Sequence, residues 1–108
     1  MTEATHVHPR HSVDEALTSP VRLSVVAALS RVDEVEFALL RDSIEISDSQ
    51  MSKQISQLEA IRYVAVRKGH VGKRPRTWLS ITPEGRVALQ WHLAALRAIV
   101  DGDVAPQP

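Results

Sequence analysis

The stretch "SDSQMSKQISQLEAIRYVAVRKGHVGKRPRTWLSITPEG", residues 47–85, changes from a helical to a strand-like pattern along its length. Its first part places Met51, Ile55 and Leu58 at positions i, i+4 and i+7, which predicts a helix with one narrow apolar stripe. Its second part alternates β-branched residues with others in "YVAVRK" and again in "TWLSI". We therefore expect a helix followed by two strands, with the basic loop "GHVGKRPR", residues 69–76, between the strands.

The ends of these elements carry recognisable capping residues. Ser47 is placed to cap the first helix, and Gln50 stands three residues later at the capping-box position. After the second strand, Thr82 caps a long helix in which Pro83 takes the first position, where a missing N–H costs nothing, and Gly102 ends it. The elements expected here are helix 47–61, two strands and helix 83–101.

Two further helices are predicted upstream. Ser19 and Pro20 begin a helix over 20–29. The segment "EVEFALLRDS", residues 34–43, predicts a second helix whose acids lie in the first turn, where the positive end of the helix dipole favours them. Only the short turn "EIS" separates it from the next helix, so the two form a helix-turn-helix. Because a hairpin follows directly, the predicted fold class is mainly α with a β-hairpin wing, a winged helix-turn-helix.

The composition of the 108 residues fits one folded domain with two tails. Hydrophobic residues make up 44% of the chain, enough for one modest core. Cysteine is absent, which removes disulfides, thiolate metal sites and cysteine nucleophiles. No apolar run approaches the ~20 residues that span a bilayer, so we expect no membrane partner. We expect a disordered tail over 1–11, a domain over 12–102 and a disordered tail over 103–108.

The formal net charge of zero conceals a strong asymmetry along the chain. Residues 32–48 contain six acids against Arg41, a local balance of minus five. Residues 60–83 contain six Lys or Arg and no acid, a local balance of plus six. Such an asymmetry indicates a polyanionic partner for the basic half, which includes the loop between the two strands.

The spaced motifs also resemble a known family. "SPVRLSVVAAL" followed by "FALLRDSIEISDSQMSKQISQLEAIRYVAVRKGHVGKRPRTWLSITPEGRVAL" is similar to the bacterial winged-helix transcriptional regulators of the MarR/ArsR type, in their small single-domain branch. The resemblance covers roughly residues 13–100 and implies a cytoplasmic, nucleoid-associated protein that binds double-stranded DNA. It places Ser47 to Gln57 in the major groove and makes Lys68 to Arg76 the wing. Arg62 stands where the family usually has glycine, so we expect a left-handed residue there or a different helix end.

Within these two segments, the residue types predict two kinds of DNA contact, one to bases and one to the sugar-phosphate backbone. Gln50 and Gln54 each offer a donor and an acceptor, which suits the N6/N7 edge of adenine. Lys73, Arg74 and Arg76 surround Pro75 in a string suited to phosphates or a narrow minor groove. The predicted base-reading residues are Ser49, Gln50, Lys53, Gln54 and Gln57. The predicted backbone contacts are Ser47, Lys68, His70, Lys73, Arg74 and Arg76.

The last helix is apolar over most of its circumference, which predicts that it makes a homodimer. Its first stripe contains Leu89, Leu93, Leu96 and Val100, and a second contains Ala88, Trp91, Ala95 and Ile99. One small domain cannot bury so much apolar surface, so we expect a symmetric dimer and an approximately palindromic operator. The predicted interface consists of Val13, Leu17, Leu89, Leu93, Leu96 and Val100.

Other functions remain open at this point. No triad, paired carboxylates or cofactor fingerprint is present, so we expect neither an enzyme nor a cofactor or metal. His6, His8 and His11 form a metal-ligating pattern only within a tail. One alternative is a winged helix that docks an acidic protein through its basic hairpin. Another is a ligand- or metal-responsive regulator with a pocket near Trp78 and Trp91, although no effector is defined.

Overall fold

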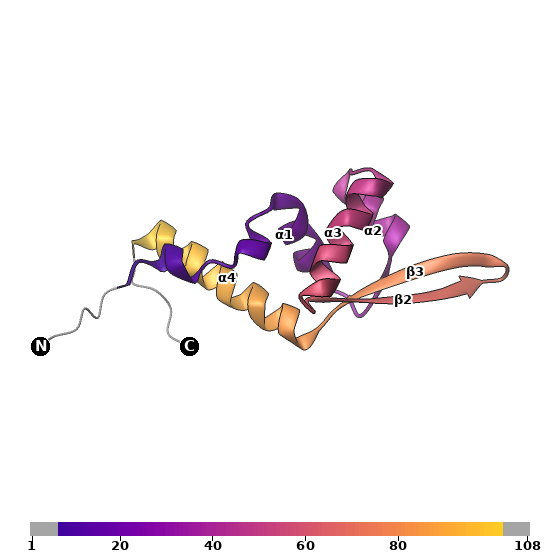
Figure 1. Cartoon of the computed structure of the whole chain (residues 1–108). Helices are drawn as coiled ribbons and strands as arrows, with labels where there is room; N and C mark the ends of the chain where they lie inside the picture. The colour runs from indigo at the N-terminus through magenta and orange to yellow at the C-terminus, as the bar shows by residue number, and fades with distance from the viewer. Residues whose placement is uncertain (1–6, 103–108) are drawn as a thin grey trace, which may run out of the picture.

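A computed structural model describes residues 7–102 as an elongated molecule of 67 × 24 × 21 Å. A helical body lies in the middle, a long hairpin extends from one end, and the last helix extends from the other (Figure 1). The helices are α1 (Pro20–Leu29), α2 (Phe37–Ile44), α3 (Asp48–Ala60) and α4 (Pro83–Asp101). Two short 3-10 turns, η1 (Pro9–Ser12) and η2 (Glu15–Leu17), precede them. The strands are β1 (Val35–Glu36), β2 (Val64–Val71) and β3 (Arg74–Ile81).

The predicted caps begin three of the helices. The Oγ of Ser19 accepts a hydrogen bond from the backbone of Arg22 at 3.2 Å, and the Oγ of Ser47 accepts one from Gln50 at 3.1 Å. The hydroxyl of Thr82 accepts from the backbone of Gly85 at 2.9 Å. These bonds satisfy amide groups that have no partner within the helix. The expected starts of α1, α3 and α4 are confirmed.

The second helix starts later than the sequence pattern predicts. Helix α2 begins at Phe37 because Val35 and Glu36 instead form strand β1, which pairs with Leu79 and Trp78 of β3. The described sheet therefore has three antiparallel strands in the order β1-β3-β2. The predicted location of the acids in the first turn of a helix over 34–43 is wrong, because these residues belong to the sheet and to the loop before it.

The hairpin is longer and its loop shorter than expected. Of the eight residues predicted as a loop, only Gly72 and Lys73 turn, since pairing continues outward to Val71 and Arg74. Gly72 takes the left-handed conformation, with φ of 63°, that such tight hairpin turns favour. Pro75 pairs with His70 in the part of β3 beyond β1, where an open strand edge tolerates a missing N–H.

Two contacts fix the long helix α4 against the base of the hairpin. Arg62 has φ of 66°, which confirms the expected left-handed residue after α3, and its carbonyl accepts a hydrogen bond from the Thr82 hydroxyl. A Cβ at Gly85 would lie 2.3 Å from the carbonyl oxygen of Tyr63. The first turn of α4 therefore packs directly on this backbone, and only glycine fits there.

The core lies beneath α3 and includes its predicted stripe. Met51, Ile55 and Leu58 are buried, so the apolar side of α3 packs inward and its polar side remains outside. Each such side chain stabilises the fold by about 1.5–3 kcal/mol through burial. The core cluster consists of Leu17, Val25, Val26, Leu29, Leu40, Met51, Ile55, Leu58, Val64, Leu79 and Leu89.

The N-terminal segment is ordered earlier than predicted. The tail expected over 1–11 is wrong for its last residues, because His8 caps η1 through its Nδ1 and Pro9 is buried where η1 contacts α4. Asp14 connects this segment to the rest of the fold. Its backbone N–H donates to Nδ1 of the buried His92 at 3.0 Å, and its carboxylate accepts from the Tyr63 hydroxyl. The expected tails over 1–6 and 103–108 lie outside the described residues.

Candidate nucleic-acid interface

The side of α3 opposite the core presents a row of small and polar side chains. Ser49, Gln50 and Lys53, all predicted to read bases, are exposed. Ser52 and Ser56 are exposed on the same helix and were not predicted as base-reading residues, although they are four residues apart and Ser56 is three from Lys53, a spacing that makes them neighbours. A helix with this narrow and largely small-sided surface fits the width of a major groove.

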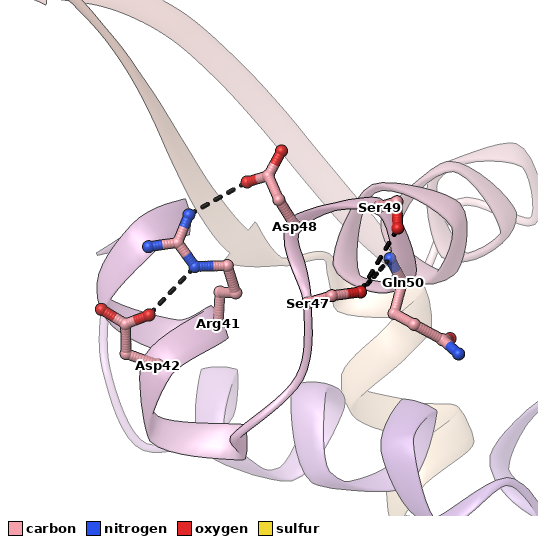
Figure 2. A network of polar contacts seen from close by, with 6 residues as sticks. All are labelled: Arg41, Asp42, Ser47, Asp48, Ser49 and Gln50. Atoms are coloured by element: carbon pink, nitrogen blue, oxygen red, sulfur yellow. Dashed lines mark hydrogen bonds and ion pairs between the residues drawn. The ribbon is translucent and has the colours of Figure 1, made fainter.

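The turn between α2 and α3 is held by a pair of ionic contacts. Arg41 of α2 donates at 3.0 Å both to its neighbour Asp42 and to Asp48 in the first turn of α3 (Figure 2). Hydrogen bonds to these two carboxylates raise the pKa of Arg41 above its usual value. On the other side of the turn, the side chain of Gln50 points away from this network. The negative charge of Asp48 would repel a phosphate at the start of α3. It is paired here with the positive charge of Arg41.

Two of the predicted base-reading residues are already engaged inside the protein. The side-chain oxygens of Gln54 and Gln57 each accept a hydrogen bond at 3.0 Å from the guanidinium of Arg22 in α1. Gln54 is half-buried, whereas Gln57 is exposed. In the free protein the oxygen of Gln54 therefore faces α1, and its use for adenine stays a prediction.

Two cations of the hairpin, Arg67 and Arg76, are paired with acids. Arg67 donates to the two oxygens of Glu34 at 2.9 and 2.7 Å and lies over the ring of Trp78. The hydrogen bonds from Arg67 lower the pKa of Glu34 below its usual value, and the same bonds raise the pKa of Arg67. Arg76, predicted to bind phosphate, lies 3.6 Å from Glu36 and is half-buried. Two acids of residues 32–48, Glu34 and Glu36, thus pair with two of the six cations of the basic segment.

The other side chains predicted for the wing are exposed. Lys68, His70, Lys73 and Arg74 are exposed, as expected for a wing. Within residues 7–102, none of the three cations among them takes part in an ion pair. A hollow of about 410 Å³ lies between α3 and the hairpin, and Lys68 lines it together with Ser52 and Ser56. Helix and wing therefore border one concave surface.

The predicted dimer residues divide into two groups. Leu17 and Leu89 are wrong as interface residues, because they are 0% and 5% exposed in the core. Leu93, Leu96 and Val100 are exposed on α4, where they line a hollow with Arg97, and Val13 is half-buried. The stripe was misassigned because the N-terminal segment packs along α4. The buried side of α4 consists of Gly85, Leu89, His92, Ala95 and Ala98.

Several other features bear on the alternatives. Trp78 contacts Arg67 and Gly69 in the hairpin, whereas Trp91 is exposed on α4. Across the described part of the chain, three or more His, Cys, Asp or Glu side chains do not gather at any metal-binding distance, and His6 lies outside it. Within the same range, helix length and apolar content do not reach what a bilayer crossing requires.

Several known proteins are similar to this chain in sequence or in fold. The winged helix DNA-binding domain family matches residues 21–100. An uncharacterised protein of Methanocaldococcus jannaschii is 29% identical over 75 residues, which are 69% of this chain and 82% of the relative. A transcriptional regulator homologue from Pyrococcus horikoshii superposes with a TM-score of 0.76 at 27% identity, over 82% of this chain and 88% of that one. A MarR-family regulator from Silicibacter pomeroyi shares the fold, with a TM-score of 0.62 at 22% identity, over 88% of this chain and 63% of that one.

The family match covers α1 to α4 and both strands of the hairpin, which are the elements that form the exposed polar helix and the cationic wing. The chain belongs to the family of winged helix DNA-binding domains.

Proposed function

We propose that this chain is a sequence-specific regulator of transcription that binds double-stranded DNA as a homodimer in the cytoplasm, on the nucleoid. Helix α3 enters the major groove, and the hairpin contacts phosphates or the adjacent minor groove. The observation that carries this proposal is that, in the described part of the chain, acids pair with only two cations of the hairpin. Arg67 and Arg76 form ion pairs, while Lys68, Lys73 and Arg74 are exposed without one among the described residues, beside the polar face of α3.

The exposed apolar surface of α4 supports the proposal that the chain forms a homodimer. Leu93, Leu96 and Val100 are 47%, 36% and 79% exposed, and they follow one another along the part of the helix that extends from the body. An apolar strip of this kind on a small domain favours association. In a two-fold dimer the same strip meets itself, and the two α3 helices face two half-sites of an approximately palindromic operator.

The test is duplex binding measured over a series of salt concentrations. Each phosphate neutralised contributes about −0.9 to the slope of log affinity against log salt concentration. Because a dimer carries two copies of every residue, Lys73→Ala should lower the magnitude of this slope by about 2 and weaken all duplexes alike. Ser24→Ala on the exposed side of α1 is the matched control and should leave the slope unchanged.

Binding that is insensitive to salt, or no binding to any duplex, would contradict the proposal. That result would favour the alternative in which the basic hairpin docks an acidic protein. Selection of duplexes from a random pool then tests sequence specificity, since a specific regulator enriches one motif and a non-specific one enriches none.

A further inference from the structure

Arg22 connects three elements that meet behind the proposed reading surface. It lies in the first turn of α1, and its Nε donates to the carbonyl oxygen of Ala16 in η2 at 2.6 Å. Its Nη1 donates at 3.0 Å to the Oε1 of Gln54 and at 3.0 Å to the Oε1 of Gln57. One guanidinium nitrogen therefore holds two side chains of α3, with one N–H available for each.

The orientation of both amides follows from the chemistry of the donor. An arginine side chain donates hydrogen bonds and accepts none, so the atom of each glutamine that faces it must be the oxygen. The two amide nitrogens are consequently directed away from Arg22. Gln54 and Gln57 are three residues apart on one side of α3, which lets a single guanidinium reach both.

This arrangement changes which base edges the exposed glutamine can recognise. Reading adenine requires the oxygen and the nitrogen of one amide to lie along the same base edge, facing N6 and N7. With its oxygen held against α1, Gln57 presents only its NH₂ group. Donors alone match best the N7 and O6 acceptors of guanine, and then O4 of thymine. Adenine offers N7 as an acceptor but places its N6 donor beside it, which opposes a second N–H.

Resting on the DNA-binding function proposed above, we propose that Arg22 is a specificity-determining positioning residue. It holds Gln57 as a hydrogen-bond donor, so that this position of α3 prefers guanine or thymine to adenine, whose N6 donor opposes the amide nitrogen. Gln54, which is half-buried, serves mainly to fix the guanidinium from a second direction. Gln50, whose side chain points away from the network of the turn, keeps both halves of its amide for adenine.

The experiment compares the motifs selected from a random duplex pool by the wild type, Gln57→Ala, Arg22→Met and Arg31→Met. Gln57→Ala locates the base pairs that depend on Gln57. At those positions the wild type should select guanine or thymine, and Arg22→Met should raise the share of adenine at least about fivefold, the low end of what a bidentate pair contributes. Arg31→Met, which alters an exposed arginine just after the same helix, should select the wild-type motif.

Two results would overturn the inference. One is wild-type selection of adenine at the positions that depend on Gln57. The other is an Arg22→Met motif identical to that of the wild type with a uniform loss of affinity, which would make Arg22 a phosphate contact instead. Gln57→Glu tests the same point in a variant that keeps the contact with Arg22. Its carboxylate still accepts from the guanidinium but has neither N–H donor of the amide. It should lose the preference for guanine or thymine.

A second readout needs no DNA and separates this inference from the proposed function. In the free protein, Arg22→Met should shift the side-chain NH₂ nuclear magnetic resonance signals of Gln54 and Gln57 and leave those of Gln50 in place. If the wild type enriches no motif while these signals shift, the proposed function fails and the positioning contact stands. Signals of Gln54 and Gln57 that stay unchanged would show that Arg22 does not orient them.

Discussion

The guanidinium of Arg67 lies 4.3 Å from the centroid of the Trp78 ring, on the opposite strand of the hairpin. The same guanidinium is bound by both oxygens of Glu34. Stacking and ion pairing together hold this cation against the hairpin and compete with a phosphate for it. Among the cations of the hairpin, those without an ion pair to any residue that the structure describes are Lys68, Lys73 and Arg74.

Removal of the acid should release that cation. Glu34→Gln leaves a neutral side chain of the same shape, so Arg67 gains freedom to contact DNA and one negative charge disappears from the binding side. We expect affinity for random duplexes at low salt to rise several-fold, with a steeper salt dependence. Titration of a labelled duplex at several salt concentrations measures this. Glu84→Gln, in the first turn of α4, is the matched control. Equal gains from both substitutions would contradict the role given to Glu34.

Tyr63 should make stability depend on pH in the alkaline range. Burial, and then the hydrogen bond to Asp14, raise the pKa of Tyr63 to about 12. This pKa in the folded chain exceeds the unfolded value of about 10, so the stabilisation is complete below pH ~10 and is lost as the pH rises through about 12. Since Tyr63 is partly exposed, we expect a loss of only about 1 kcal/mol. Urea unfolding at pH 8 and 11.5 should show this loss in the wild type and not in Tyr63→Phe. An identical loss in both proteins would contradict the assignment.

Gly85→Ala should destabilise the fold although alanine is the better helix former. The preference for alanine within a helix is about 1 kcal/mol. It is outweighed by the contact of the added Cβ with the Tyr63 carbonyl, which forces α4 away from the base of the hairpin. We expect a net loss of about 1–3 kcal/mol in the free energy of unfolding. Gln90→Ala, at an exposed position of the same helix, should change it by less than about 0.5 kcal/mol. A Gly85→Ala protein as stable as the wild type would refute this close packing.

Leu93→Glu should prevent the proposed self-association. In a two-fold interface the substitution places two like charges in an apolar strip, each of which must be desolvated. We expect the dimer to weaken at least about a hundredfold, because each buried charge costs more than about 1.4 kcal/mol. Sedimentation equilibrium of the two proteins measures the change. Ser24→Glu adds the same charge on α1 and should leave the mass unaffected. If Leu93→Glu retains the wild-type mass, α4 does not form the interface through this strip.

The elements that the sequence predicted well are those whose signals are local. Ser47 and Thr82 lie within three residues of the amides they cap, so the starts of α3 and α4 can be read from short segments. The fold class follows from the order of such segments. The length of the wing was missed because it depends on pairing between His70 and Pro75, whose residue types resemble a loop.

The errors at the candidate site also come from contacts between residues that are far apart in the sequence. The link from Arg22 to Gln54 joins residues 32 positions apart, and no periodicity within either helix indicates it. The stripe assigned to the dimer failed at Leu89 because this residue packs in the core cluster with residues of the other helices and the sheet, which no pattern within α4 indicates. His92, a polar residue in the buried face of α4, is satisfied only by the backbone N–H of Asp14, far away in the chain.

The elongated shape has a mechanical consequence. The hairpin and the far end of α4 lie at opposite ends of a molecule 67 Å long, and Gly85 packs closely where the helix leaves the hairpin. In a dimer formed through α4, the angle at which the two helices meet would therefore set how far apart the two wings stand.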